Sequence, residues 1–137
     1  MPVVTFHLVA GRHDPDAVGE LLRRSCALFA DVLDSPIDRV RAFATLHEPE
    51  LACVGGRMVA DGAPEAPFFQ FALLAGRPLD HRQRLLAGFT DLLVEVLGAD
   101  RALVRGGIWL VDPEDWAIGG VPAAVQRRAE VEARRTS

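Results

Sequence analysis

The 137-residue sequence contains no lysine, so all 15 of its basic residues are arginine. Acidic residues outnumber them, with 19 aspartates and glutamates and a formal net charge of −4. A surface that binds nucleic acid needs a clustered excess of positive charge to contact phosphates. The charge balance therefore argues against a nucleic-acid partner.

Cysteine and histidine are also scarce. Cys26 and Cys53 stand alone, in neither a CxxC pair nor another metal-binding spacing. We therefore expect two buried free thiols. The four histidines are His7, His13, His47 and His81. They share no metal-ligand spacing, so no metal site is predicted.

Long hydrophobic runs are missing. No stretch approaches the roughly 18 to 20 uninterrupted apolar residues of a membrane-spanning helix. The first residues lack the basic flank, apolar run and cleavage site of a signal peptide. We therefore expect a cytoplasmic protein without a membrane partner. Half of the residues are hydrophobic, which suffices for one buried core, so residues 1–137 are predicted to form a single domain.

One eleven-residue pattern occurs twice. Residues 2–12 read PVVTFHLVAGR and residues 67–77 read PFFQFALLAGR, an offset of 67 − 2 = 65 positions. Val40-Arg41 recurs as Val104-Arg105, 64 positions later (104 − 40). The sequence therefore predicts two copies of one unit, the pseudo-repeats 2–57 and 67–121. A linker, 58–66, joins them, and a tail, 123–137, follows.

The first unit predicts a strand, a helix and a second strand. Residues 3–9 are mostly apolar without strict alternation, which is typical of a strand covered on both faces. Asp14 followed by Pro15 is a favourable helix start, and an apolar stripe continues to Leu33. Residues 40–46 predict the second strand. A crossover of this length implies parallel pairing with a right-handed connection.

The second unit repeats this plan. Residues 68–75 and 104–111 predict strands, and Asp80 with Gln83 resembles a capping box that starts a helix ending at Gly98. Each unit is too short to bury a core alone. We therefore predict an α/β (α+β) fold of two fused βαβ units, with one four-stranded sheet and two helices on one face. The tail reads as a solvated or partner-bound helix that frays at its end.

The order of motifs resembles the tautomerase superfamily. These motifs are Pro2 after the initiating Met, Gly-Arg after the first strand, Val-Arg on the second, and Trp116 before an x-Ile-Gly-Gly ending. Small members of the superfamily look like 4-oxalocrotonate tautomerase, and the doubled form is similar to malonate semialdehyde decarboxylase and other fused members. The resemblance covers about residues 2–122. It implies a homotrimer that imitates the hexamer of the short members, and no metal or organic cofactor.

The resemblance implies that Pro2 is catalytic once Met1 is removed. Its nitrogen would then be a free secondary amine, whereas the nitrogen of Pro67 is locked in an amide. A free α-amine has a pKa of about 8. Burial in an apolar site beside arginines lowers that pKa toward neutrality, which suits a general base. The alternative is that Pro2 only provides a rigid start for the strand.

Four arginines match the substrate-binding positions of the family. The Gly-Arg loops match Arg12 and Arg77, and the second strands match Arg41 and Arg105. In fused members the site at the terminal proline draws its arginine from the second half, which makes Arg77 the strongest candidate. Arg41 or Arg105 from a neighbouring chain would help to hold a substrate carboxylate in bidentate geometry. For Arg12, a surface ion pair is an equally open reading.

Two further residues match positions near the family's site. Trp116 matches an aromatic residue there, as a wall that excludes water or as a core residue. Asp38 resembles an acidic residue that decarboxylase-like members use near the proline, and it can also be a turn cap. Those members carry two arginines around a proline in the second Gly-Arg loop. This chain reads Arg77-Pro78-Leu79 instead, which argues against decarboxylation.

The sequence thus predicts a cofactor-independent isomerase. The expected reaction is keto–enol tautomerisation of a small 2-keto acid, a carboxylate-containing substrate, with Pro2 as general base. One alternative is a decarboxylase-like or hydratase-like lyase in which Pro2 stays protonated. Another is a non-catalytic oligomeric binding protein of the same fold.

Overall fold

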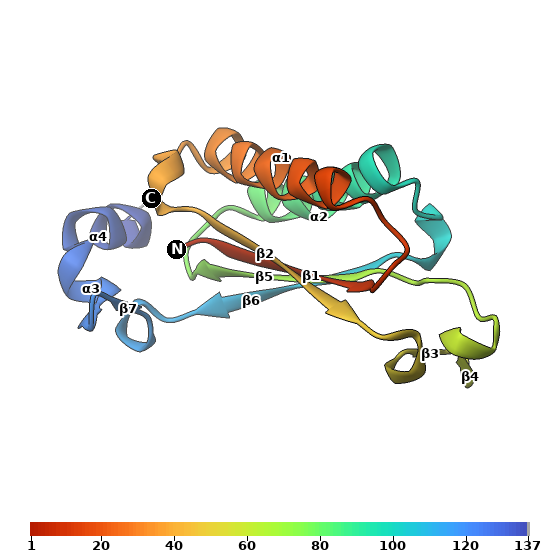
Figure 1. Ribbon diagram of the computed structural model, residues 1–137. Coiled ribbons are helices and arrows are strands. Elements are labelled where there is room, and N and C mark those ends of the chain that lie inside the picture. The colour runs from red at the N-terminus through yellow and green to blue at the C-terminus, as the bar shows by residue number, and fades with distance from the viewer. Residues whose placement is uncertain (137) are drawn as a thin grey trace.

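Two βαβ units form the structure, a computed structural model that describes residues 1–136. The first unit consists of β1 (Val3–Val9), α1 (Pro15–Leu33) and β2 (Arg41–His47). The second consists of β5 (Phe68–Leu74), α2 (Leu79–Leu97) and β6 (Arg105–Val111). The predicted fold class is confirmed, because all four long strands belong to one sheet and both long helices cover the same face (Figure 1).

Short elements complete each unit. A hairpin of β3 (Cys53–Val54) and β4 (Arg57–Met58) follows the first unit, and one of β7 (Ala117–Ile118) and β8 (Val121–Pro122) follows the second. The chain ends in the helices α3 (Ala123–Gln126) and α4 (Arg128–Thr136). Five 3-10 turns connect the elements: Ile37–Arg39, Pro49–Leu51, Val59–Asp61, Arg101–Leu103 and Pro113–Asp115.

The strand order is β2-β1-β5-β6. Each unit contributes a parallel pair, as predicted, and the two units join through the antiparallel central pair β1 and β5. Val3 is paired with Ala72, and His7 with Phe68. The start of β1 therefore lies at the same edge of the sheet as the end of β5.

Aromatic packing holds the helices on the sheet. The rings of five buried phenylalanines contact one another at centroid distances of 4.9 to 6.2 Å: Phe6, Phe29, Phe69, Phe71 and Phe89. Aromatic pairs at such distances add to the stabilisation from burial. Gly106 of β6 makes room for this cluster, because a Cβ there would lie only 2.1 Å from the Phe69 ring.

The helix starts agree with the sequence in one unit only. The carboxylate of Asp14 accepts a hydrogen bond from the Asp16 amide at 2.9 Å and caps α1, as predicted. The capping box at Asp80 is wrong, because α2 already begins at Leu79 and Pro78 is its N-terminal cap. The rigid φ of proline suits the extended residue that precedes a helix, so no side-chain cap was required to set the start. Gly98 ends α2 with a φ of 70°, as predicted.

The sheet face opposite the two long helices is less covered than predicted. Burial alternates along β1, with Val4 and Phe6 buried and Thr5 only partly so. None of the helices within residues 1–136 covers the face on which Thr5 lies, so β1 is not covered on both faces within one chain. Phe43, which is paired with Thr5 across β1 and β2, leaves 55% of its surface exposed there.

The predicted linker and tail are more ordered than expected. Val59 and Ala63 of the linker are buried against Val9, so this segment closes a small second core. In the tail, Ala123 and Val131 are buried, so a merely solvated helix is wrong. The tail instead packs back onto the body of the protein, and Ser137 lies outside the described residues.

Two other expectations concern cysteine and membranes. Cys26 is partly buried, but Cys53 in β3 is exposed, so the prediction of two buried thiols is wrong for Cys53. Both thiols are free. Across residues 1–136, none of the helices has the length and apolar character needed to cross a membrane.

Candidate active site

Pro2 is buried at the start of β1, where both units and the tail meet. Its carbonyl oxygen accepts a hydrogen bond from the Arg41 amide at 3.0 Å, which fixes Pro2 to the neighbouring strand. The antiparallel pairing of β1 and β5 brings the end of β5 to the same edge. Figure 1 shows the N-terminus between the sheet and the C-terminal helices α3 and α4.

A cleft of about 340 Å³ opens beside Pro2. Three arginines line it, Arg39, Arg41 and Arg127, and they are accompanied by Trp116 and the exposed Asp38. Three guanidinium groups outweigh one carboxylate in this wall. The cleft therefore suits a small anion, because arginine binds carboxylates through paired donors.

A second, smaller cavity of about 30 Å³ lies on the other side of Pro2, under α4. Arg77, Glu130 and Arg134 line it. Its volume holds no more than a water molecule or two. Five residues line both the cavity and the cleft and so separate them, namely Met1, Pro2, Arg39, Ile118 and Arg127.

The electrostatics at this edge disfavour a positive charge on the chain terminus. Burial lowers the pKa of the Met1 amine below its usual value, and the neighbouring charges of Arg41, Arg127 and Arg39 lower it further. With Met1 present, the ring nitrogen of Pro2 belongs to an amide and has no basic lone pair. Without Met1, the terminal amine would be that nitrogen, one residue further into the same surroundings.

Arg77 is held in place under α4. Its Nη1 donates a hydrogen bond to the Leu33 carbonyl at the end of α1, at 3.0 Å. Burial lowers the pKa of Arg77, as does Arg134, while Glu130 and Asp34 act in the opposite direction. A Cβ on Gly76 would lie 3.3 Å from the Cβ of Arg134, so the Gly76-Arg77 loop packs closely against α4.

The structure gathers most of the site residues that the sequence predicts. The cleft is lined by four of them, Pro2, Asp38, Arg41 and Trp116. The adjoining cavity is lined by a fifth, Arg77. Arg12 and Arg105 lie at the opposite end of the sheet. The amide of Arg105 donates to the Pro67 carbonyl at 3.1 Å, just as the amide of Arg41 does to that of Pro2. Within one chain, neither Arg12 nor Arg105 lies at the Pro2 site.

Sequence reasoning missed four charged residues that line the cleft or the cavity, namely Arg39, Arg127, Glu130 and Arg134. The Nη1 atom of Arg39 donates to both carboxylate oxygens of Glu130, each at 3.1 Å. These two residues are 91 positions apart, and no local spacing links them. For the three residues in the tail the only signal was its density of charge, which also fits a solvated helix, and Arg39 had no signal of its own.

The opposite end of the sheet has a different chemistry. A pocket of about 320 Å³ there is lined by His7, His47 and Glu65, and its described lining residues include no arginine. The two imidazoles lie 2.8 Å apart, and burial together with His47 lowers the pKa of His7. Glu65 accepts hydrogen bonds from the Val9 amide and from His13, at 2.7 and 2.6 Å. Among residues 1–136, no three His, Cys, Asp or Glu side chains group in a way that could hold a metal ion.

Comparison with known proteins places these features in a family. A family model described as "Tautomerase enzyme" matches residues 67–126. A 2-hydroxymuconate tautomerase from Comamonas testosteroni is 40% identical over 57 residues, which are 42% of this chain and 90% of the relative.

Solved structures of similar proteins cover nearly the whole chain. The structure of a native fused 4-OT is 31% identical, with a TM-score of 0.85, and the match covers 92% of this chain and 99% of the other. A wild-type fused 4-OT solved as a symmetric trimer has the same fold, with a TM-score of 0.81, 22% identity, and coverage of 90% and 98%.

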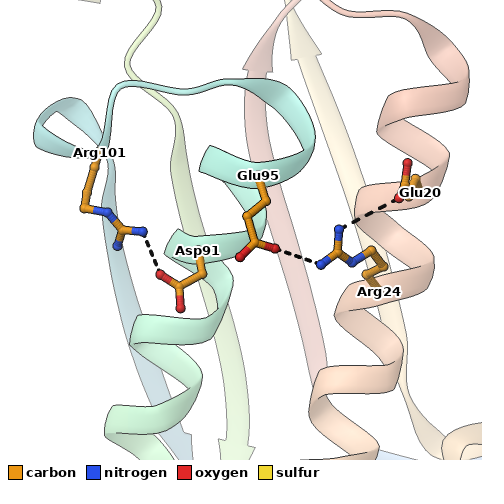
Figure 2. Close-up of polar contacts among 5 residues, drawn as sticks. All are labelled: Glu20, Arg24, Asp91, Glu95 and Arg101. Atoms are coloured by element: carbon orange, nitrogen blue, oxygen red, sulfur yellow. Dashed lines mark hydrogen bonds and ion pairs between the residues drawn. The ribbon is translucent and has the colours of Figure 1, made fainter.

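The electrostatic account of this edge can be tested at the chain terminus. Arg41 is the neighbouring charge that lowers the pKa of the Met1 amine most. We therefore expect Arg41→Gln to raise the pKa of the terminal amine, whether Met1 or Pro2 carries it. The pH dependence of acylation of the terminal amine, followed by mass spectrometry, measures it because only the free amine reacts. The matched control is Arg101→Gln on the helix side of the sheet, where Arg101 pairs with Asp91 at 2.7 Å (Figure 2). An unchanged pKa in Arg41→Gln, or an equal rise in the control, contradicts the account.

Proposed function

This chain belongs to the tautomerase superfamily as a fused member, and we propose that it catalyses keto–enol tautomerisation of a small 2-keto acid with Pro2 as general base. The observation that carries the proposal is the position of Pro2. It is buried at the wall of a cleft lined by three arginines, where the pKa of the amine of the adjoining Met1 is lowered. A lowered pKa leaves more of the amine unprotonated at neutral pH, which is what a general base requires.

The reaction needs one base and a place for negative charge. The lone pair of Pro2 takes a proton from the carbon next to the keto group, and the electrons of that C–H bond move to the carbonyl oxygen to form an enolate. The resulting ammonium returns its proton to the oxygen or to another carbon of the conjugated system. Arg41 in the cleft wall stabilises the oxyanion through the charge and the donors of its guanidinium group.

Substrate binding is assigned to arginine side chains. Arg77 is the first candidate to hold the substrate carboxylate, because it matches the second-half arginine that fused members use at the terminal proline. It lies next to Pro2, where it lines the small cavity and donates to the Leu33 carbonyl. Arg41, or Arg105 from a neighbouring chain, supplies a second guanidinium group. Trp116 in the cleft wall limits access of water, which strengthens the electrostatic interactions inside.

A second candidate function rests on Asp38, which lines the same cleft as Pro2. A carboxylate beside a protonated proline would fit a hydratase-like or decarboxylase-like lyase. The three arginines that lower the pKa of the Met1 amine would act in the same direction on a terminal Pro2 and so work against a protonated proline, so we favour the tautomerase. A non-catalytic binding protein would show neither activity.

We assign a homotrimer as the assembly. Fused 4-OT proteins of the same fold are trimers, in symmetric and asymmetric forms. In this chain the sheet face without helices exposes the aromatic side chains of Phe43, Phe68 and Trp109. It also carries a hollow of about 230 Å³ beside Trp109. Contact with copies of the chain would cover this apolar face.

The role of Pro2 is tested by comparing the two equivalent prolines. We expect Pro2→Ala to lower kcat/KM for ketonisation of the enol of an aryl pyruvate by at least about 100-fold, the lower range for loss of a general base. In the wild type, kcat/KM should rise with pH and level off above the lowered pKa of the amine, because only the unprotonated amine accepts a proton. Stopped-flow absorbance of the enol measures both.

Pro67→Ala is the matched control, since Pro67 has the same place in its repeat but an amide nitrogen. Its kcat/KM should stay within about threefold of the wild-type value. Equal losses in both variants would contradict a specific role of Pro2. A rate that falls as pH rises through the titration of the amine would instead support the lyase-type, protonated proline.

The two Gly-Arg loops provide a second matched pair. We expect Arg77→Gln to lower kcat/KM by about 10- to 100-fold, which corresponds to the loss of a hydrogen bond to a charged group. Arg12→Gln removes the equivalent side chain at the other end of the sheet and should change kcat/KM by less than about twofold. Steady-state kinetics on the same enol measures kcat/KM of both variants. Equal effects of the two substitutions contradict the assignment of Arg77 to substrate binding.

The trimer is tested on the face without helices. A charge at Trp109, which is 51% exposed in the single chain, should prevent burial of that face. We expect Trp109→Glu to shift the protein from trimer to monomer in sedimentation velocity, while far-UV circular dichroism remains unchanged. Leu79→Glu, on an exposed residue of α2, is the control and should leave the trimer intact. A wild-type monomer, or a trimer that tolerates Trp109→Glu, contradicts the proposed assembly.

A further inference from the structure

One carboxylate of the chain lies among the arginines that face Pro2. Glu130, on α4, lines the small cavity together with Arg77 and Arg134. Both of its oxygens accept hydrogen bonds from Nη1 of Arg39 at 3.1 Å. Arg39 also lines the open cleft on the other side of Pro2. Arg39 therefore holds Glu130 and is also part of the wall that a molecule in the cleft would meet.

The contact between Arg39 and Glu130 can be exchanged. Their side chains keep 29% and 42% of their surface exposed, and ion pairs with this much contact with water contribute little to stability. The helix does not depend on this contact alone. Val131 is buried, and Arg134 packs against the loop at Gly76. Loss of the ion pair should therefore leave α4 in position.

The substrate class proposed for this site carries the same chemical group as Glu130. We infer that Glu130 is a specificity-determining residue, an internal carboxylate that holds Arg39 and gives it up when the carboxylate of a ligand binds in the cleft. Every carboxylate ligand then competes with Glu130, whereas an uncharged ligand does not. This inference rests on the proposed function only in assuming that a carboxylate enters the cleft.

A purely structural role for Glu130 makes a different prediction. Glutamine has nearly the same shape as glutamate, and its carbonyl oxygen still accepts a hydrogen bond from Arg39, but it carries no charge. If Glu130 only tethered α4, Glu130→Gln would leave the affinity for carboxylates unchanged or lower it. If Glu130 competes for Arg39, the same substitution raises that affinity.

The test measures binding and does not depend on turnover. We expect Glu130→Gln to lower the dissociation constant of pyruvate, used as a carboxylate probe in calorimetric titration, by about 3- to 10-fold. Arg39→Gln should raise it, because the guanidinium group is then missing. An aryl acetaldehyde, which lacks a carboxylate, should bind with the same dissociation constant in the wild type and in Glu130→Gln. In far-UV circular dichroism both variants should show the helix content of the wild type, as expected if α4 stays folded.

Glu95→Gln is the matched control. Glu95 pairs with Arg24 at 2.8 Å between the two long helices, and its side chain is 56% exposed (Figure 2). This substitution changes the net charge by the same amount far from Pro2, and we expect no change in pyruvate binding. Equal tightening in Glu95→Gln and Glu130→Gln would overturn the inference in favour of a general charge effect. Weaker or unchanged binding in Glu130→Gln would overturn it in favour of a tether.

The two proposals fail in different ways. If Pro2→Ala keeps full turnover, the general-base role is lost, but the ratio of pyruvate affinities between Glu130→Gln and Glu95→Gln is unaffected. If that ratio is one while Pro2→Ala abolishes turnover, the function stands and the role of Glu130 is refuted.

Discussion

The antiparallel pairing of β1 and β5 is the constraint on which the site depends. It joins two parallel pairs head to tail, so the start of each unit meets the end of the other unit's first strand. Pro2 thereby meets Arg77 and Trp116 from the second unit. If β1 and β5 were parallel instead, Pro2 would lie beside Pro67, and Arg77 would lie with Arg12 at the far end of the sheet.

The two repeats give the sheet two equivalent ends, one at Pro2 and one at Pro67, and these ends have different chemistry. Only one end carries a chain terminus, and arginines from three separate segments surround it. The other end lies around Pro67, whose nitrogen cannot be a base. In place of arginines it carries a pair of histidines and the carboxylate of Glu65, which is hydrogen-bonded to His13. The tail accentuates this difference, because α4 packs at the Pro2 end and brings Arg134 and Glu130 to it.

The sequence predicts the fold closely because its signals are local and occur twice. The repeated Pro-to-Gly-Arg pattern and the Asp14-Pro15 start place the first strand and helix of the first unit within about a residue of their observed bounds. The residues that reasoning missed are those that act at long range. Glu130 meets Arg39 only because α4 folds back, and nothing in either local sequence encodes that contact. The start of α2 was missed because Pro78 acts through its backbone rather than through a capping side chain. The roles of the site residues, the cytoplasmic location and the trimer stay predictions.

The central claim is that an unacylated ring nitrogen lies at this cleft and reacts there. Intact-mass analysis of the protein purified from its native source, before and after incubation with a small electrophilic 2-keto acid, tests it most directly. The account predicts a chain that lacks Met1 and that gains one adduct, mapped to the nitrogen of Pro2. A chain that retains Met1, or an adduct at any other residue, would contradict it.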